Sequence, residues 1–197
     1  MRFADADVLP YDFTDFADTM RRYATEVQKL LSDKREEIRA RNEAIDQHRY
    51  DAASDPRHPL LAPPKQAVPT FLNFAPLENA LSTLDKSAQR YSKAIQAFAR
   101  KNEGTNGGDL SALNALLIQT ERRLTSSNGL PRRPWFKHLI YAPGFYTGYG
   151  AKTLPGIREG IEEKRYEEAE REIGRVAQAL NEYAASVDRI AEELEKK

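Results

Sequence analysis

The sequence predicts an all-α fold, namely an antiparallel four-helix bundle with a long irregular loop before the last helices. In four segments the apolar residues recur at spacings that alternate between three and four, which places them on one helical face. Segments rich in proline or glycine separate these apolar stripes. No sheet is expected, because the strand-like run HLIY is too short to imply one.

The first helix is expected soon after Pro10, with Asp12 or Thr14 as its N-cap. A mostly charged stretch follows the apolar stripe and is interpreted as the solvated end of the same helix, fraying near Tyr50. The predicted inner face consists of Phe13, Phe16, Met20, Tyr23, Val27, Leu30, Leu31 and Ile38.

Residues 51–70 contain five of the eleven prolines and are predicted to form a loop. The second helix is expected from about Pro76 to the glycine-rich NEGTNGGD. Its inner face is predicted to contain Leu77, Leu81, Leu84, Ala88, Tyr91, Ile95 and Phe98.

Asp109 or Ser111 is expected to begin a third helix, which SSNGLPRRP closes. Residues 131–156 lack a clear period, Pro155 opens a short helix, and a long final helix is predicted from about Tyr166 to Glu193. The predicted apolar positions of the third helix are Leu110, Leu113, Leu116, Leu117 and Leu124, and those of the last are Ala169, Ile173, Val176, Leu180, Tyr183, Val187, Ile190 and Leu194.

Length and composition limit the possible functions. The 197 residues suit a single helical domain over 1–197. Thirty basic residues balance thirty acidic ones, which argues against nucleic acid or an anionic membrane as a partner. No apolar run approaches the length of a transmembrane helix, and the N-terminus lacks the basic segment followed by an apolar segment that is typical of a signal peptide. We therefore expect a segment excised from a larger protein, whose compartment this end does not reveal.

One group of residues has side chains of the types that bind zinc: His48, Asp51, Asp55 and His58. Their spacing matches no helical face, and they lie in the proline-rich connector, so a solvated polar loop is the favoured interpretation. The chain has no cysteine, no H-E-x-x-H, no G-x-S-x-G and no phosphate-binding glycine motif. We therefore assign no catalytic and no metal-binding residue.

The segment 129–157 is the exception, since an irregular stretch of this length in a helical protein is usually functional. Its aromatic residues could shield a pocket, and tyrosine hydroxyls such as that of Tyr141 could reach polar atoms of a ligand. Arg132, Arg133 and Lys137 could attract a carboxylate. An aromatic plug packed on the end of the bundle is the alternative.

Gly129 to Pro143 reads G-L-P-x-R-P-aromatic-aromatic-basic-H-x-I-Y-A-P, and this motif resembles the C-terminal helical domain of glutamate carboxypeptidase II. The opening R-F-A-D-A-D-V-L-P-Y-D-F, the sequence Pro155-Gly156-Ile157 and the final helix are similar to the same domain, so the resemblance covers almost the whole chain. Members of this family are zinc exopeptidases or the inactive transferrin receptors.

The resemblance implies a transferrin receptor-like dimerisation domain that pairs two copies and contacts the protease-like and apical domains of its parent. The zinc ions and the catalytic glutamate belong to the protease-like domain, so no cofactor is expected in this chain. The resemblance leaves the location of the parent protein undecided between secreted, periplasmic and membrane-anchored.

The resemblance also names candidate substrate-binding residues, because in the carboxypeptidases the loop after Y-A-P closes over the C-terminal glutamate of the substrate with a lysine and a tyrosine. Tyr149 falls on the tyrosine position and Gly148 on the lysine position; Tyr141 is the third candidate. The glycine offers no charge, which calls glutamate specificity into question. The loop is unlike the shortened loop of the receptors and favours a peptidase parent.

The leading hypothesis is a non-catalytic dimerisation domain that lends a loop to the substrate pocket of a metallopeptidase. A standalone helical protein–protein interaction module is the alternative. An independent metalloenzyme that uses His48 and His58 is the third.

Overall fold

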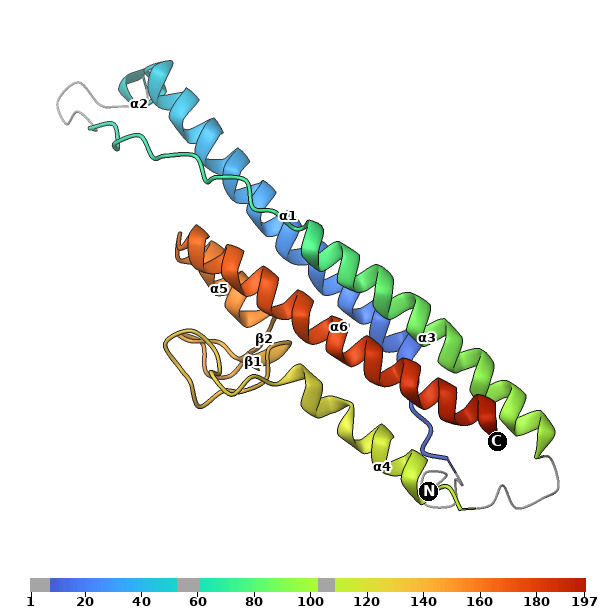
Figure 1. Ribbon diagram of the computed structural model, residues 1–197. Coiled ribbons are helices and arrows are strands. Elements are labelled where there is room, and N and C mark those ends of the chain that lie inside the picture. Colours follow the sequence, from blue (N-terminus) through green and yellow to red (C-terminus); the bar gives the residue numbers. More distant parts are fainter. Residues whose placement is uncertain (1–7, 53–60, 103–108) are drawn as a thin grey trace.

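The computed structural model describes residues 8–52, 61–102 and 109–197 and is mainly helical (Figure 1). The described part consists of long helices α1 (Phe13–Asp46), α3 (Ala75–Lys101) and α6 (Tyr166–Lys196), short helices α2 (Arg49–Ala52), α4 (Ser111–Gln119) and α5 (Pro155–Glu162), the 3-10 turn η1 (Glu121–Leu124), and strands β1 (Tyr141–Pro143) and β2 (Ala151–Thr153).

Helix α1 begins with the predicted cap. Asp12 Oδ1 accepts the backbone N–H groups of Thr14 and Asp15 at 3.0 and 3.1 Å, which satisfies two of the donors that a helix N-terminus leaves open. The helix ends at Asp46, before the predicted Tyr50. His48 just beyond has φ of 52°, a left-handed conformation that an α-helix does not continue through.

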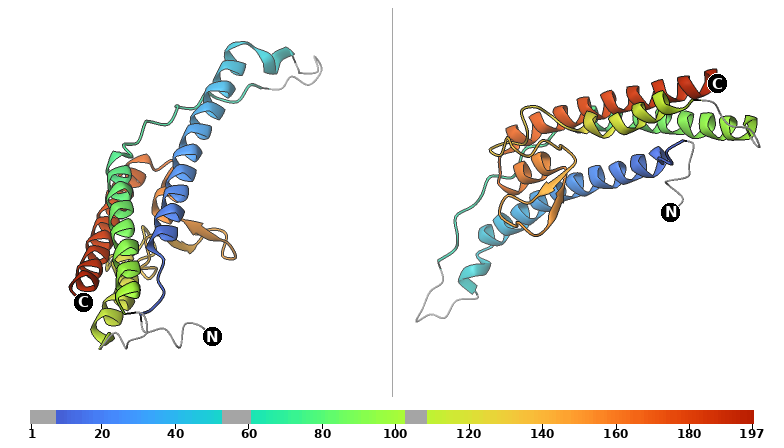
Figure 2. Two further views of the ribbon diagram at one scale, coloured as in Figure 1. Left: turned by 90° about the vertical axis from the view of Figure 1, so that its right-hand side faces the viewer. Right: turned by 90° about the horizontal axis from the view of Figure 1, so that it is seen from below.

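The predicted loop 51–70 is irregular from residue 61, although its first two residues belong to α2. The irregular segment 61–74 runs back along α1 (Figure 2). Asn42 on α1 donates to the Gln66 carbonyl at 2.7 Å and accepts the Gln66 N–H at 3.0 Å. Arg35 donates to the Pro69 carbonyl, and its guanidinium lies 3.6 Å from the centroid of the Phe71 ring. Side chains of α1 therefore supply partners to a backbone that has no ladder of its own.

The long helices do not all alternate in direction. Helix α1 is antiparallel to α3, since Gln28 bonds to Glu78 near the start of α3 at 2.8 Å, whereas Arg21, earlier on α1, pairs with Asp85, later on α3. Helices α3 and α6 run parallel: just before α3, the Asn73 N–H bonds to Glu170 at 3.1 Å, and at the far end Lys101 Nζ donates to the Lys197 carbonyl at 2.6 Å.

The predicted all-α class is confirmed in its main feature, but the antiparallel bundle of four long helices is not. Helix α4 has only 9 residues, because the Thr120 N–H and hydroxyl both return to the Leu117 carbonyl and the chain tightens into the 3-10 turn. The parallel α3–α6 pair arises because α4, the hairpin and α5 carry the chain back to the starting end of α3 before α6 begins (Figure 1).

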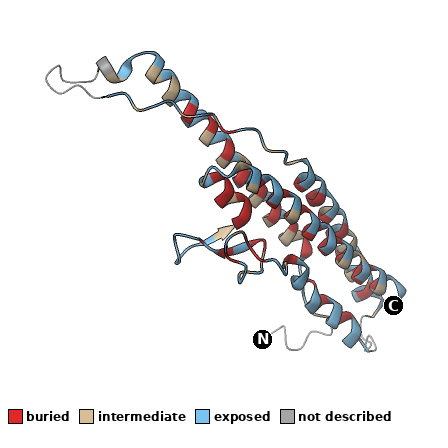
Figure 3. Ribbon diagram, turned by 60° about the vertical axis from the view of Figure 1, so that its left-hand side comes forward, coloured by how far each residue is buried: buried red, intermediate tan, exposed pale blue. Residues whose placement is uncertain are grey.

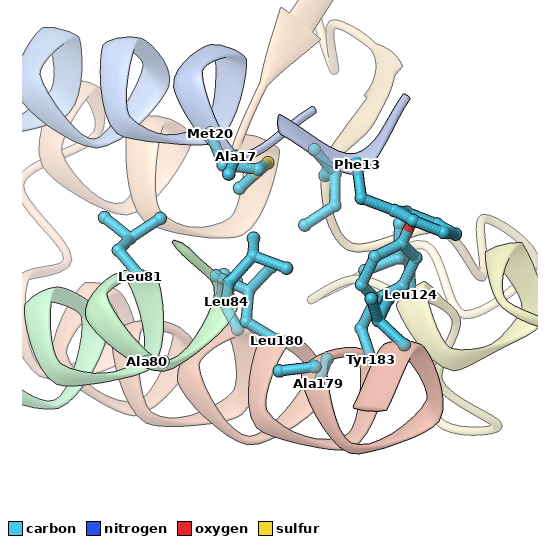
Figure 4. Packing of buried hydrophobic residues seen from close by; sticks show 14 of the residues in the cluster. Phe13, Ala17, Met20, Ala80, Leu81, Leu84, Leu124, Ala179, Leu180 and Tyr183 are labelled. Carbon is cyan, nitrogen blue, oxygen red and sulfur yellow. The ribbon is translucent and has the colours of Figure 1, made fainter. Parts of the chain in front are cut away.

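The core lies where the apolar faces of α1, α3 and α6 meet, and α4, η1 and α5 close it along α6 (Figure 4). Phe13 stands edge-on to Tyr91 and Tyr183, with ring centroids 4.7 and 5.9 Å apart. All eight positions predicted for the inner face of the last helix are buried. Within the described ranges, none of the helices combines the length and the apolar character needed to cross a bilayer.

Candidate functional site

Y-A-P and the ten residues after it form a small hairpin, Tyr141–Thr153, which the sequence did not predict. Strand β1 pairs antiparallel with β2, with Tyr141 opposite Thr153 and Pro143 opposite Ala151. A two-stranded ribbon has only edge strands, so it tolerates Pro143. The loop 144–150 joins the strands and is closed by the Gly144 N–H on the Gly150 carbonyl at 3.0 Å.

Gly144 lies close to the Thr147 side chain, which would have to turn away from a larger residue at this position. A Cβ at this position would lie 2.3 Å from Thr147 Oγ1, inside any permitted contact distance. The Gly150 N–H in turn donates to the Thr147 carbonyl at 3.1 Å. The loop therefore folds tightly on itself through its own backbone hydrogen bonds.

A buried ion pair anchors the base of the hairpin. Arg133 Nη2 lies 2.9 and 2.8 Å from the two carboxylate oxygens of Glu159 on α5, and the side chains are 3% and 5% exposed. Arg133 also donates to the Pro143 carbonyl, and Glu159 accepts the Phe145 N–H at 2.9 Å. One pair thus fixes the backbone on both sides of Gly144 to helix α5.

Tyr141, a predicted substrate-binding residue, lies in a separate cluster at the start of β1. Its ring stacks on His138 with centroids 3.9 Å apart, and its hydroxyl donates to Glu121 Oε1 at 2.9 Å. His138 Nε2 lies 3.0 Å from the same oxygen, and Nδ1 accepts the Ile140 N–H at 3.2 Å. The geometry assigns the proton of a neutral His138 to Nε2.

Burial governs the protonation of this cluster. Desolvation lowers the pKa of His138 below its ordinary value of 6.5, against the opposing hydrogen bond from Glu121. Desolvation also raises the pKa of the Tyr141 phenol, and Glu121 adds to that rise. Both rings are therefore neutral at pH 7, and the Tyr141 hydroxyl is engaged with Glu121.

Gly148 and Tyr149 lie together at the tip of the loop. The Tyr149 side chain is fully exposed, and a Cβ on Gly148 would have no heavy atom within 4 Å. Phe145 and Tyr146 pack edge to face on the same loop, 4.8 Å between centroids, and Tyr146 is 74% exposed. Figure 3 shows this end of the hairpin standing out as exposed chain. The tip presents aromatic surface, and it does not contact the Tyr141 cluster through any described hydrogen bond or ring stack.

The three cations predicted to attract a carboxylate are held by the protein itself. Arg132 Nη1 lies 2.5 Å from Glu168 and Nη2 lies 3.2 Å from Glu163. Arg133 is buried against Glu159, and Lys137 donates to the Ser127 carbonyl at 2.5 Å. The carboxylates that hold Arg132 and Arg133 belong to α5, to α6 and to Glu163 between them, all of which follow the hairpin in sequence.

The sequence reasoning missed Glu121 and Glu159, because a single carboxylate has no spacing to recognise. The available signal for Glu159 is its place in PGIREGI, a short helical turn whose neighbours are apolar or glycine. A carboxylate there is buried and needs a partner. Of the four residues whose side chains are of zinc-binding types, Asp55, His58 and the Asp51 side chain lie outside the described part, and His48 has an interaction partner.

Comparison with known proteins identifies relatives over most of the chain. Residues 72–188 match the transferrin receptor-like dimerisation domain. The probable glutamate carboxypeptidase LAMP1 of Arabidopsis thaliana is 28% identical over 91% of this chain and 21% of its own length. A probable glutamate carboxypeptidase of Arthroderma benhamiae is 24% identical over 90% of this chain and 20% of its own length.

A third relative is an inactive zinc metalloprotease of Schizosaccharomyces pombe, 34% identical over 37% of this chain and 9% of its own length. The chain thus spans about a fifth of the length of the two carboxypeptidase relatives.

Proposed function

Because this chain belongs to the transferrin receptor-like dimerisation domain family, we propose that residues 1–197 are one helical, non-catalytic domain of a glutamate carboxypeptidase-like zinc metallopeptidase. In this role it pairs two copies of the parent, contacts the protease-like and apical domains, and lends the loop 144–150 to the substrate pocket. The parent's protease-like domain carries the zinc. The observation that carries the proposal is the alignment of the two named carboxypeptidases along about nine tenths of the chain.

The hairpin supports the loop's part in this proposal. A loop that contacts substrate must keep its shape while leaving side chains free, and 144–150 has internal hydrogen bonds, a buried anchor and a fully exposed Tyr149. Loops held on a rigid scaffold commonly carry binding residues. Tyr149, Gly148 and Tyr141 are the proposed substrate-binding residues. The contacts with His138 and Glu121 hold Tyr141 at the start of β1.

Replacing Tyr149 by phenylalanine in the whole protein tests the loop. A hydrogen bond to a carboxylate contributes roughly 1.5–3 kcal/mol, so kcat/KM should fall about ten- to a hundredfold, mainly through KM. Tyr146→Phe is the matched control on the same loop. Unchanged kinetics in the Tyr149 variant, with an unchanged melting temperature, would remove the substrate-contacting role and leave self-association as the domain's proposed task.

The standalone interaction module is a second candidate, supported by the exposed Leu116 and Ile118 on α4. Sedimentation of the whole protein, with zinc content and peptidase activity measured on the same sample, separates the two candidates. A metallopeptidase parent should sediment as a zinc-containing dimer, whereas an adaptor would lack zinc and peptidase activity.

A further inference from the structure

The charges around the hairpin point to a class of substrate. Residues 129–165 are all described by the structure, and each lysine and arginine among them has a partner. Five pair with a carboxylate at the base or sides of the hairpin: Arg132, Arg133, Lys152, Arg158 and Arg165. The other two donate to uncharged oxygens, Lys137 to the Ser127 carbonyl and Lys164 to the Gln66 side chain.

The tip of the loop has no charge to add. From Gly144 to Gly150 the sequence is GFYTGYG, without a basic or acidic residue. His138, the histidine nearest in sequence, is neutral at pH 7, because burial lowers its pKa. The nearest guanidinium, that of Arg132, lies 5.5 Å from the centroid of the Phe145 ring and is already paired with Glu163 and Glu168. A carboxylate side chain brought against this loop would therefore lose water without gaining an unpaired cation, which is costly.

The same tip offers apolar contact instead. Three aromatic side chains are exposed, although the base of the hairpin is anchored: Phe145 to 38%, Tyr146 to 74% and Tyr149 fully. Aromatic rings contribute large contact areas and pair edge to face with other rings. The arrangement suits an uncharged, apolar side chain, and an aromatic side chain suits it best.

We infer that the loop 144–150 selects peptides whose C-terminal residue has an uncharged apolar or aromatic side chain, and that it disfavours C-terminal glutamate. This inference rests on the proposed function, in which the loop meets the substrate's last residue. Tyr149 supplies the ring that contacts that side chain, and the absence of a side chain at Gly148 leaves space for it.

The test compares dipeptides that share their first residue and end in Phe, Leu, Gln or Glu, with the whole protein as catalyst. We expect kcat/KM for the Phe peptide to exceed that for the Glu peptide at least tenfold. Titration calorimetry with free phenylalanine and free glutamate should give the same order of affinity without turnover. A wild-type preference for glutamate in both measurements overturns the inference.

Two variants separate this inference from the proposed function. Gly148→Lys should reduce the Phe-over-Glu ratio about tenfold by placing a cation on the tip, while Asn79→Lys on the exposed face of α3 adds the same charge elsewhere and should leave the ratio unchanged. If wild type prefers phenylalanine but neither Gly148→Lys nor Tyr149→Phe alters kinetics or binding, the preference comes from another domain, and both the inference and the loop's proposed role fail. If the variants act but wild type prefers glutamate, only the inference fails.

Discussion

At the scale of single residues, Glu121 and Glu159 hold the chain at the start of the hairpin's first strand and just beyond its end. Glu121 accepts the Tyr141 hydroxyl at the start of β1, and Glu159 accepts the Phe145 N–H just after it. Neither carboxylate is on the hairpin, so each ties it to a helical segment, η1 or α5. The position of the loop tip therefore depends on charges some distance from the tip in sequence.

Glu159→Gln should destabilise the protein strongly. The change leaves the buried Arg133 guanidinium without its counter-charge, and breaking a buried pair costs about 3–5 kcal/mol. Urea unfolding followed by circular dichroism gives the difference. Glu162→Gln, which removes the partly exposed pair with Lys152, should cost below about 1 kcal/mol. Equal losses in the two variants would contradict the assignment, and replacing Arg133 and Glu159 together by Met and Leu should cost less than Glu159→Gln.

His138 should make stability depend on pH in a defined direction. Its folded-state pKa lies below the unfolded value near 6.5, so the unfolded chain takes up a proton that the folded chain resists. Stability should therefore fall as pH decreases from 6.5 through the folded pKa, and this residue should contribute no slope above that window. His138→Gln should show a smaller drop in unfolding free energy between pH 7.5 and pH 5.5. Identical drops in both proteins would refute this role for His138.

At the scale of elements, helix ends and helix faces are set by local chemistry. The cap at Asp12 illustrates this, because the hydrogen bonds from Thr14 and Asp15 that hold the helix end also lower the pKa of the Asp12 carboxyl. The hairpin depends on tertiary contacts instead of local ones. Strands β1 and β2 have only 3 residues each, and contacts with η1 and α5 keep them together.

Asp12→Ala should cost about 1 kcal/mol, the usual effect of removing an N-cap. Asp18→Ala changes an exposed carboxylate in the first turns of the same helix and is the control, with an expected effect within about 0.5 kcal/mol. Thermal unfolding at pH 7 provides the comparison. At a pH well below 3.8 the gap between wild type and Asp12→Ala should narrow, because the protonated cap loses much of its strength; a constant gap would argue against the cap.

In these elements the sequence predicts which helix faces are buried, but it does not predict helix direction or long-range side-chain pairs. The apolar periods of α1, α3 and α6 predicted their buried faces, because a stripe records which side of a helix avoids water. A stripe carries no information on direction, so the parallel course of α3 and α6 was not foreseeable. Arg133 and Glu159 are 26 residues apart, and no local pattern connects them. The roles of Gly148 and Tyr149 stay predictions that come from the family resemblance.

At the scale of the whole molecule, α6 is the helix on which the others converge. It packs against α3, α4, α5 and η1, and its inner face is buried along nearly its entire length. Unfolding should therefore be cooperative, since α3, α4, α5 and η1 all lose a partner that covers part of their apolar surface once α6 leaves.

Leu180→Ala should test this central position. Leu180 is 0% exposed, and truncating a buried leucine costs about 2–5 kcal/mol, including the cavity left behind. Leu116→Ala on α4 removes the same atoms from a side chain that is 40% exposed and should cost far less. Calorimetric unfolding should show one transition in each protein. A second transition in Leu180→Ala would mean that α1 and α3 remain folded without α6.

The parallel course of α3 and α6 also fixes the order in which the chain can fold. The hydrogen bonds that join their two ends span 97 and 96 residues, so neither can form by closing a short turn. Helix α1 can meet α3 early during synthesis, but the other side of α3 must wait until the hairpin and α5 have been made and α6 follows. Contacts of such long range form slowly. The nascent chain therefore carries α3 with one apolar side uncovered while residues 102–165 are made, and chaperones can bind to the α6-facing side of α3 during that interval.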